Sequence, residues 1–156
     1  MKESKMYQEY QKDDFIVSTD PDKLNLTVIH WYLSERSYWA KGISFSLVEK
    51  SIQNSLNFGV YQQEEQVGYA RVISDFTTFA YLCDVFILPD YRGRGLSKWL
   101  ITCIQEHPEL QGLRRFMLMT RDAHGLYSQH GFSPLKDATG VMEITKPGIY
   151  LQQAAN

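Results

Sequence analysis

The chain has 156 residues, of which 44% are hydrophobic and 22% are charged. This length and apolar share predict one domain with a sizeable core, and they exclude an intrinsically disordered chain. Its 16 basic and 18 acidic residues give a net charge of −2, which excludes a broad electrostatic attraction to nucleic acid or to anionic lipid.

Apolar periodicity and turn residues predict alternating strands and helices along the whole chain. The expected elements of the first half are a strand at 15–17, a helix at 24–32, an aromatic-rich polar loop at 34–42, a helix at 45–56, and a hairpin of strands at 58–62 and 66–74. Those of the second half are a central strand at 77–88, a helix at 94–106, a strand at 115–119, a short helix at 123–130 and a last strand at 141–145. This order predicts a single α/β (α+β) domain whose central, mixed and mostly antiparallel sheet carries helices on both faces.

Neither the ends of the sequence nor its cysteines indicate secretion or metal binding. Residues 1–14 are polar and charged, and we expect them to be a flexible N-terminus without a signal peptide. The longest nearly uncharged apolar run, at 79–88, is far too short to span a bilayer. Cys83 and Cys103 lie in apolar runs outside any zinc spacing, which predicts reduced core residues. We therefore expect a soluble cytoplasmic protein with no metal, no membrane partner and no nucleic-acid partner.

The most informative stretch joins the central strand to the following helix and reads Arg92-Gly93-Arg94-Gly95-Leu96-Ser97. The first turn of a helix has unpaired N–H groups and a partial positive charge, so it normally favours acidic residues. Here Arg92, Arg94 and Lys98 add positive charge instead, and the glycines would let a phosphate approach the backbone. The pattern indicates an anion site, although solvated basic residues on a glycine turn are the alternative. The spacing excludes a P-loop and the dinucleotide-binding motif.

Residues 92–97 resemble the acetyl-CoA signature of the GCN5-related N-acetyltransferases, the GNAT family. That signature is Arg or Gln, two residues, Gly, one residue, and Gly or Ala, so Ser97 departs from it at the last position. Residues 120–132 are similar to a second family signature, Asn-x-x-Ala-x-x-Leu-Tyr-x-x-x-Gly-Phe. Only Thr120, in place of Asn, differs there. The resemblance covers about residues 15–145.

The resemblance implies direct transfer of an acetyl group from acetyl-CoA to the amine of a small molecule or a peptide, with no metal. The residues that would bind acetyl-CoA are Val85, Phe86 and Ile87 through their main chain, then Arg92, Gly93, Arg94, Gly95, Leu96 and Ser97, and finally Thr120 and Tyr127. Tyr127 matches the family's usual general acid, which protonates the leaving thiolate. Dimers are common in the family, so a homodimer is an expectation too.

The general base is less defined. Asp84 is the only charge in the central strand, so it could take the ammonium proton or bind a cationic acceptor. A structural carboxylate bonded to a neighbouring backbone group or to an Arg is the equal alternative. Glu35 and Tyr81 are weaker candidates for the base, and loop 34–42 matches the region that borders the acceptor site in the family.

Three other functions fit the same residues. An acyltransferase with a different acyl donor or an oxygen acceptor would use the same acetyl-CoA-binding residues. A non-catalytic CoA-binding sensor or regulatory module would keep these residues but would not catalyse acetyl transfer. A nucleotide-binding domain could use the Arg-Gly turn alone, and competition by ATP but not by CoA would identify it.

Overall fold

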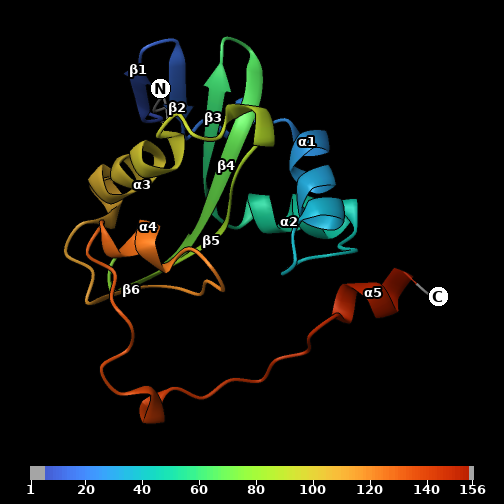
Figure 1. Cartoon of the computed structure of the whole chain (residues 1–156), viewed down its shortest axis with the longest axis vertical. Helices are drawn as coiled ribbons and strands as arrows, with labels where there is room; N and C mark the ends of the chain where they lie inside the picture. The colour runs from blue at the N-terminus through green and yellow to red at the C-terminus, as the bar shows by residue number, and fades with distance from the viewer. Residues whose placement is uncertain (1–5, 155–156) are drawn as a thin grey trace, which may run out of the picture.

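One six-stranded sheet forms the centre of the computed structural model, which describes residues 6–154 (Figure 1). The strands, which lie in the sheet in chain order, are β1 (Glu9–Lys12), β2 (Phe15–Ser18), β3 (Leu56–Gln62), β4 (Glu65–Ser74), β5 (Phe79–Ile87) and β6 (Arg115–Leu118). Every neighbouring pair is antiparallel except β5 and β6, which are parallel. The mixed, mostly antiparallel sheet predicted from the sequence is therefore confirmed, and β5 takes the expected place inside it.

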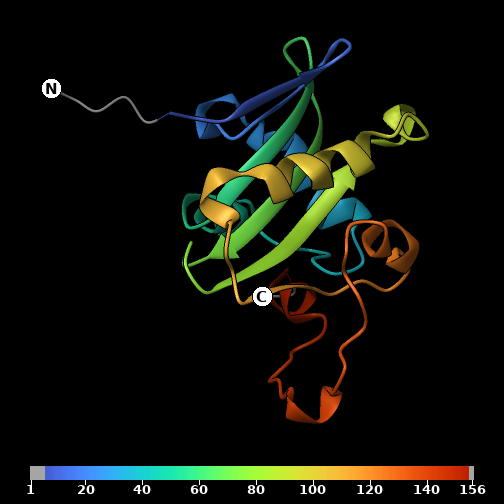
Figure 2. The same ribbon diagram turned by 90° about the vertical axis from the view of Figure 1, so that its left-hand side faces the viewer.

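Helices cover both faces of this sheet, as predicted (Figures 1 and 2). They are α1 (Leu26–Trp31), α2 (Phe45–Gln53), α3 (Leu96–Glu106), α4 (His124–Ser128) and α5 (Ile149–Ala154). Between them lie 3-10 turns at Pro21–Lys23, Pro89–Tyr91, Pro108–Leu110 and Ala138–Gly140, and a π turn at Tyr32–Arg36. None of the helices within residues 6–154 combines the length and the apolar character needed to cross a membrane.

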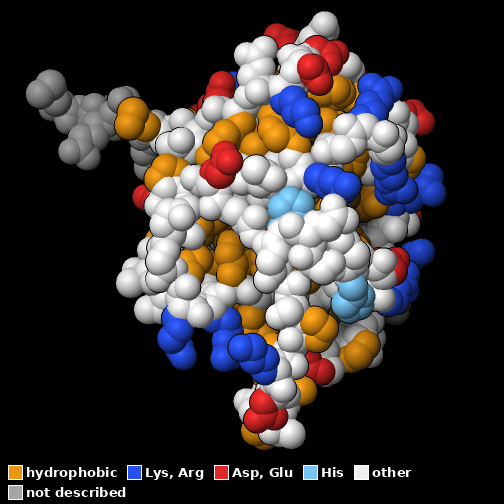
Figure 3. Space-filling view, turned by 60° about the vertical axis from the view of Figure 1, so that its left-hand side comes forward, with side chains coloured by type: hydrophobic (Ala, Val, Ile, Leu, Met, Phe, Trp, Pro, Cys, Tyr) orange, Lys and Arg blue, Asp and Glu red, His pale blue; other side chains and the backbone are white. Residues whose placement is uncertain are grey.

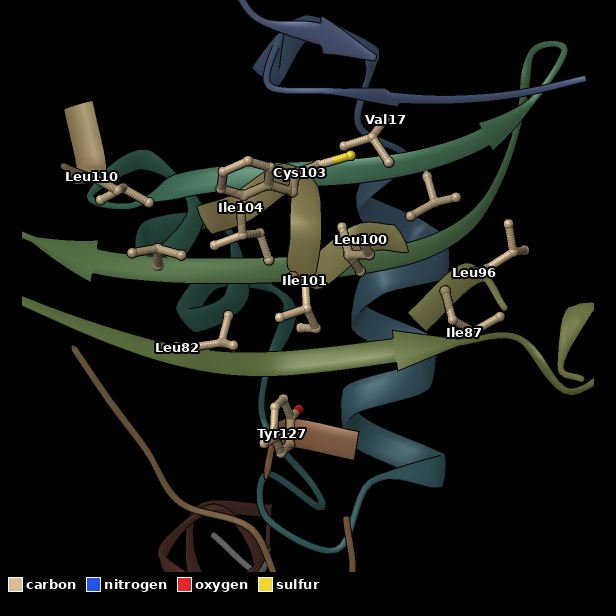
Figure 4. Packing of buried hydrophobic residues seen from close by; sticks show 14 of the residues in the cluster. Val17, Leu82, Ile87, Leu96, Leu100, Ile101, Cys103, Ile104, Leu110 and Tyr127 are labelled. Carbon is tan, nitrogen blue, oxygen red and sulfur yellow. The ribbon is translucent and has the colours of Figure 1, made fainter. Parts of the chain in front are cut away.

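Two clusters of buried side chains hold the helices to the sheet. Leu96, Leu100 and Ile104 repeat every four residues along α3, so they lie on one face of the helix and pack against the sheet. Figure 4 shows this face of α3 lying over Leu82 and Ile87 of β5. On the opposite face, α1, the π turn and α2 bury a second cluster against Tyr69 and Phe86. The sheet therefore lies between two layers of packed apolar side chains.

The sheet opens in the second half of β5. The ladder between β5 and β6 ends at the pair Leu82 and Leu118, although β5 continues to Ile87. On its other side, β5 carries a bulge, because only Ala70 of β4 faces the two residues Asp84 and Val85. Asp84 has φ +54°, which is the left-handed conformation that an L-residue rarely adopts. Bulges of this kind re-aim side chains next to functional sites.

The structure corrects the sequence predictions at several places. The helix predicted at 45–56 ends at Gln53, Leu56 already belongs to β3, and α5 was not predicted. Residues 9–12, expected in a flexible N-terminus, form β1, which pairs with β2 in a hairpin; residues 1–5 lie outside the described part. The loop predicted from residue 34 begins later, because the π turn continues the first helix to Arg36. Residues 141–145 form no strand, and their side chains are exposed. A strand needs a partner for its backbone hydrogen bonds, and no strand of the described chain lies beside this segment.

Candidate functional site

The N-terminus of α3 begins at an open turn with two glycines. Gly93 and Gly95 have φ +79° and +76°, so the chain needs glycine at both positions to turn into the helix. Gly95 is the N-cap residue and has no side chain to cap the helix, and no acid lies in the first turn. A Cβ atom built on either glycine would meet nothing within 4 Å, so the space above the turn is open. The backbone N–H groups of this turn can therefore be approached from solvent.

The two arginines of this turn differ in their contacts. The guanidinium of Arg92 donates from Nε to the Ile87 carbonyl at 2.9 Å and from Nη2 to the Tyr32 hydroxyl at 2.9 Å. It therefore fixes the turn to the end of β5 and to the π turn. Arg94 is exposed, and its guanidinium carbon lies 5.4 Å from the ring centroid of Tyr91. Arg92 is thus held by two hydrogen bonds, whereas the Arg94 guanidinium makes no hydrogen bond to another residue of the described chain and lies over the Tyr91 ring.

The free side of β5 lies next to this turn. Val85, Phe86 and Ile87 follow the point where β6 leaves β5, so none of them has a ladder partner on that side among residues 6–154. Phe86 is 4% exposed, and its ring stacks on Tyr32 with centroids 4.0 Å apart. The side chains of Phe86 and Ile87 therefore serve the core, and only the main chain of this stretch is free to pair with an extended ligand.

Asp84 is held by two fixed donors. Its Oδ1 atom accepts a hydrogen bond from Trp39 Nε1 at 2.8 Å, and its Oδ2 atom accepts one from Arg71 Nε at 2.8 Å. Arg71 also donates from Nη1 to Ser55 Oγ at 3.0 Å. The Arg71 cation compensates the charge of the Asp84 carboxylate, which is 8% exposed. This arrangement matches the structural alternative for Asp84, in which the carboxylate is bonded to an Arg.

Sequence reasoning missed Arg71. It lies on β4 among apolar residues, where it is the only charge between Gln66 and Ile73. A lone Arg on one buried strand and a lone Asp on the next could have suggested the pair, because buried charges are normally paired. The ion pair forms at the bulge, however. There the residue directly opposite Arg71 in the ladder is Cys83, and Asp84 is the next residue along β5.

Tyr127 lies on α4 with its ring packed under the sheet (Figure 4). The residue is 8% exposed, and its hydroxyl makes no hydrogen bond to another described residue. Burial raises the pKa of Tyr127 to about 12, and the neighbouring Tyr38 and Asp122 act in the same direction. The hydroxyl therefore carries its proton at neutral pH, as an ordinary tyrosine does, and burial makes it a weaker acid.

A cleft of about 1,100 Å³ opens where β5 and β6 separate. Its walls bring together the residues singled out above and the aromatic loop, namely Trp39, Arg71, Tyr81, Asp84, Val85, Thr120 and Tyr127. Thr120 Oγ1 accepts a hydrogen bond from Ala123 N at 3.0 Å and so fixes the start of α4. Glu35 is exposed on the π turn and does not line the cleft.

The loop at 34–42 forms one rim of the cleft. Tyr38 accepts a hydrogen bond from the backbone N–H of Arg121 at 3.1 Å, and the Arg121 guanidinium lies 3.8 Å above the Tyr38 ring. Together with the bond from Trp39 to Asp84, this contact ties the loop to β5 and to the segment before α4. The sequence indicated the aromatic loop that contains Tyr38 but not its contact with Arg121, because that contact joins positions 83 residues apart.

No group of three or more His, Cys, Asp or Glu side chains within residues 6–154 is placed to hold a metal ion. Cys83 and Cys103 are free thiols, and burial raises the pKa of each to about 12. Both therefore stay protonated at neutral pH, as expected of thiols in an apolar environment.

Comparisons with known proteins find similar proteins among the acetyltransferases. A family model described as an acetyltransferase (GNAT) domain matches residues 53–134. A protein of Gibberella zeae that is named as an acetyltransferase is 31% identical over 161 aligned positions, which cover 88% of this chain and 90% of that protein. A crystal structure from Xanthomonas campestris, described as a GNAT-family protein, is 50% identical with a TM-score of 0.87, and the match covers 90% of this chain and 99% of that one.

A further structure shares the fold alone. A Mycobacterium tuberculosis protein, crystallised in complex with CoA, has a TM-score of 0.62 at 14% identity, over 77% of this chain and 72% of that chain.

Proposed function

The chain belongs to the GNAT acetyltransferase family, and on that basis we propose that it transfers an acetyl group from acetyl-CoA directly to the amine of a small molecule or a peptide. The observation that carries the proposal is the cleft between β5 and β6. Val85 of the free β5 main chain and Tyr127, whose hydroxyl has no hydrogen-bond partner within residues 6–154, line this cleft. The open turn before α3 does not line it but follows the end of β5 in the chain.

The residues of the chain fit acetyl-CoA, which would supply the acetyl group as an activated thioester. The turn from Arg92 to Ser97 offers backbone N–H groups, with Arg94 as a countercharge, for the phosphates. The main chain from Val85 to Ile87 offers hydrogen bonds to an extended pantetheine arm, as an edge strand does to a peptide. A relative of the same fold was crystallised with CoA, which supports this use of the fold.

Three groups of the chain would then act on the reaction. A backbone N–H at the bulge of Asp84 and Val85 would polarise the carbonyl that is attacked. The hydroxyl of Tyr127, which carries its proton at neutral pH, would donate that proton to the departing thiolate, and the proton that the attacking amine loses would pass to solvent in the open cleft. The aromatic rim at Tyr38 and Trp39 would border the acceptor amine.

We assign Asp84 a positioning role. Each of its oxygens already accepts a hydrogen bond from a fixed donor, and the Arg71 cation compensates its charge. Asp84 therefore holds Trp39 at the rim and keeps the bulge in place, and it is not an uncompensated anion to which an ammonium group would bind.

Thermal unfolding with and without acetyl-CoA is the first test, with ATP and NAD as controls. A ligand at 100 times its Kd stabilises a fold by about 2.7 kcal/mol, which for this size corresponds to a rise in Tm of about 5–11 °C. A shift with acetyl-CoA and CoA alone supports the proposal, and a shift with ATP alone would favour a nucleotide-binding domain. No shift at millimolar acetyl-CoA would refute it.

Release of the CoA thiol in the presence of an amine panel tests the chemistry. Tyr127→Phe should lower kcat by roughly 10²-fold, the range of a general acid, without weakening CoA binding. Tyr10→Phe is the matched control, since it removes a hydroxyl from β1, away from the cleft. Binding of CoA without turnover of any amine in the wild type would point to a non-catalytic module. An unchanged kcat in Tyr127→Phe, with chemistry rate-limiting, would remove Tyr127 from the mechanism.

A further inference from the structure

One wall of the cleft between β5 and β6 has no part in the chemistry proposed above. This wall belongs to α2, where four residues at the helical spacing i, i+3, i+4 and i+7 line the cleft, namely Leu47, Lys50, Ser51 and Asn54. Val48 and Ile52 of the same helix are buried in the core, so packing holds this stripe toward the cleft. The wall therefore presents an ammonium, a hydroxyl and an amide group to whatever occupies the cleft beside it.

The sheet adds further hydrogen-bond donors to this part of the cleft. Leu82 of β5 packs in the cluster under α3, so its neighbours Tyr81 and Cys83 point to the opposite face, the one that α2 covers. The Tyr81 hydroxyl lines the cleft and makes no hydrogen bond to another residue within 6–154. Arg71 lies opposite Cys83 and uses its Nε and Nη1 groups, but its Nη2 group makes no hydrogen bond within the same residues. Two donors of the sheet are thus free for a ligand.

The charged residues that line the cleft leave one cation without a partner. They are two acids, Asp84 and Asp122, and three bases, Lys50, Arg71 and Arg121. Arg71 is paired with Asp84 at 2.8 Å, and the Arg121 guanidinium lies 4.0 Å from Asp122. Lys50 is exposed and makes no ion pair with any other residue of the described chain. The cleft therefore carries a net positive charge, and no acid on its walls is left for a second ammonium group.

Positive charge alone does not identify a binding site. Basic side chains gather at several places on the surface, as Figure 3 shows for one face of the molecule. Lys50 also lies in the last turn of α2, where a cation interacts favourably with the helix dipole. What distinguishes Lys50 from a solvated lysine is its place on the wall of a cleft whose other walls supply the free donors of Tyr81 and Arg71. Donors and uncompensated positive charge in one cleft indicate an anionic ligand.

We propose that this wall binds an acidic group of the acceptor, so that the substrate is an amine that also carries a carboxylate or a phosphate. The inference rests on the acetyl transfer proposed above. Lys50, Tyr81 and the Nη2 group of Arg71 would donate hydrogen bonds to the anion, while the amine would lie toward Val85 and Tyr127 on the same cleft. The acidic group takes part in binding alone, and the transfer step is unchanged. A diamine would bring its second ammonium toward Lys50, so repulsion between like charges disfavours it.

Matched pairs of amines test the proposal on the full chain, with release of the CoA thiol from acetyl-CoA as the readout. The pairs are γ-aminobutyrate and n-butylamine, phenylalanine and phenethylamine, and phosphoethanolamine and ethanolamine, so the two members of each pair differ by the acidic group. In at least one pair the acid-bearing member should have a kcat/KM at least about 10-fold above its partner, because hydrogen bonds to a charged group contribute about that factor. The pair with the larger ratio distinguishes a carboxylate from a phosphate. Putrescine, which adds a second ammonium to n-butylamine, should react no faster than n-butylamine.

Variants of Lys50 identify the group that makes the selection. Lys50→Gln should lower kcat/KM for the acid-bearing member by about 5-fold, the upper end for an exposed ion pair, and should lower that of the neutral partner much less. Lys50→Arg should keep the preference, because it keeps the charge. Lys12→Gln is the matched control, since Lys12 is also exposed and without an ion pair in the described chain but lies on β1, outside the cleft. A role of Lys50 in the helix dipole alone would lower the Tm without changing the ratio within a pair.

Failure of this inference can be told apart from failure of the acetyl transfer. If neutral amines are acetylated as fast as their acid-bearing partners, or putrescine faster than n-butylamine, the inference is wrong and the proposed reaction stands. The same ratio in Lys50→Gln as in the wild type would overturn it too. If no amine releases CoA, titration calorimetry of the CoA complex with the same compounds decides. Binding of acid-bearing members in preference to their partners would then support the anion site without the transfer, and equal or absent binding would overturn it.

Discussion

Replacing Arg71 by methionine should destabilise the protein strongly, because the Asp84 carboxylate would lose its cation at the bulge. Arg71 Nε lies 2.8 Å from Asp84 Oδ2, and the side chains are 16% and 8% exposed. Breaking a buried ion pair by removing one partner costs about 3–5 kcal/mol. Both side chains keep some contact with water, so we expect the lower end, about 3 kcal/mol. For a domain of this size that corresponds to a fall in Tm of about 6–12 °C.

Differential scanning calorimetry of five proteins measures this effect: the wild type, Arg71→Met, Asp84→Asn, the double variant and a control. Arg114→Met is the matched control, because Arg114 is exposed and makes no ion pair with another described residue, and it should change stability by less than about 0.5 kcal/mol. Adding Asp84→Asn to Arg71→Met should restore part of the loss, since an amide needs no cation. Asn also tolerates the φ of +54° at this position and can still accept from Trp39.

Two results would refute this reasoning. Arg71→Met with a Tm within about 2 °C of the wild type would mean that solvent screens the carboxylate at the bulge. A double variant whose loss equals the sum of the two single losses would mean that Arg71 and Asp84 stabilise the fold independently.

Three further outcomes are expected. Gly95→Ala should lower the free energy of unfolding by about 1–2 kcal/mol, because Gly95 has φ +76°. The same variant should weaken CoA binding, measured by titration calorimetry. Ser97→Ala, which introduces a residue that is usual in the family, should leave the Kd for CoA unchanged. Burial lowers the pKa of His107, so the stability it contributes is fully present above about pH 6.5 and is lost as the pH falls from that value through the lower pKa of the folded state. His107→Gln should therefore reduce the change of the urea midpoint between about pH 7 and 5. Burial raises the pKa of Tyr127 to about 12, so kcat should show no alkaline loss from this group below about pH 10, and the stability it contributes should fall as the pH rises from about 10 to about 12.

The parts of the site that could be predicted from the sequence are those in which a local pattern determines the structure. The turn from Arg92 to Ser97 follows a buried strand and begins a helix within a few residues, so its glycines and basic charges already indicated an anion site. Tyr127 was found through its spacing to Gly131 and Phe132 on one short helix. In both places the chain brings the functional groups together without any long-range contact.

The contacts of Asp84 could not be predicted, because they depend on a departure from regular pairing. A regular antiparallel ladder has one residue opposite one residue, but here Ala70 faces both Asp84 and Val85. The bulge brings Asp84 to Arg71 of the neighbouring strand and to Trp39 of a distant loop. A count of charges along β5 shows that Asp84 is unusual, but it does not show which donors surround it.

The segment at 141–145 shows how a correct local pattern can fail to form the predicted element. The alternation of its side chains favours a strand, but a strand exists only where another backbone completes its hydrogen bonds. Within the described chain, one side of β6 has no ladder partner and the segment lies beside no strand. Alternating side chains therefore do not suffice to form a strand, because the backbone of the segment has no neighbouring backbone with which to pair.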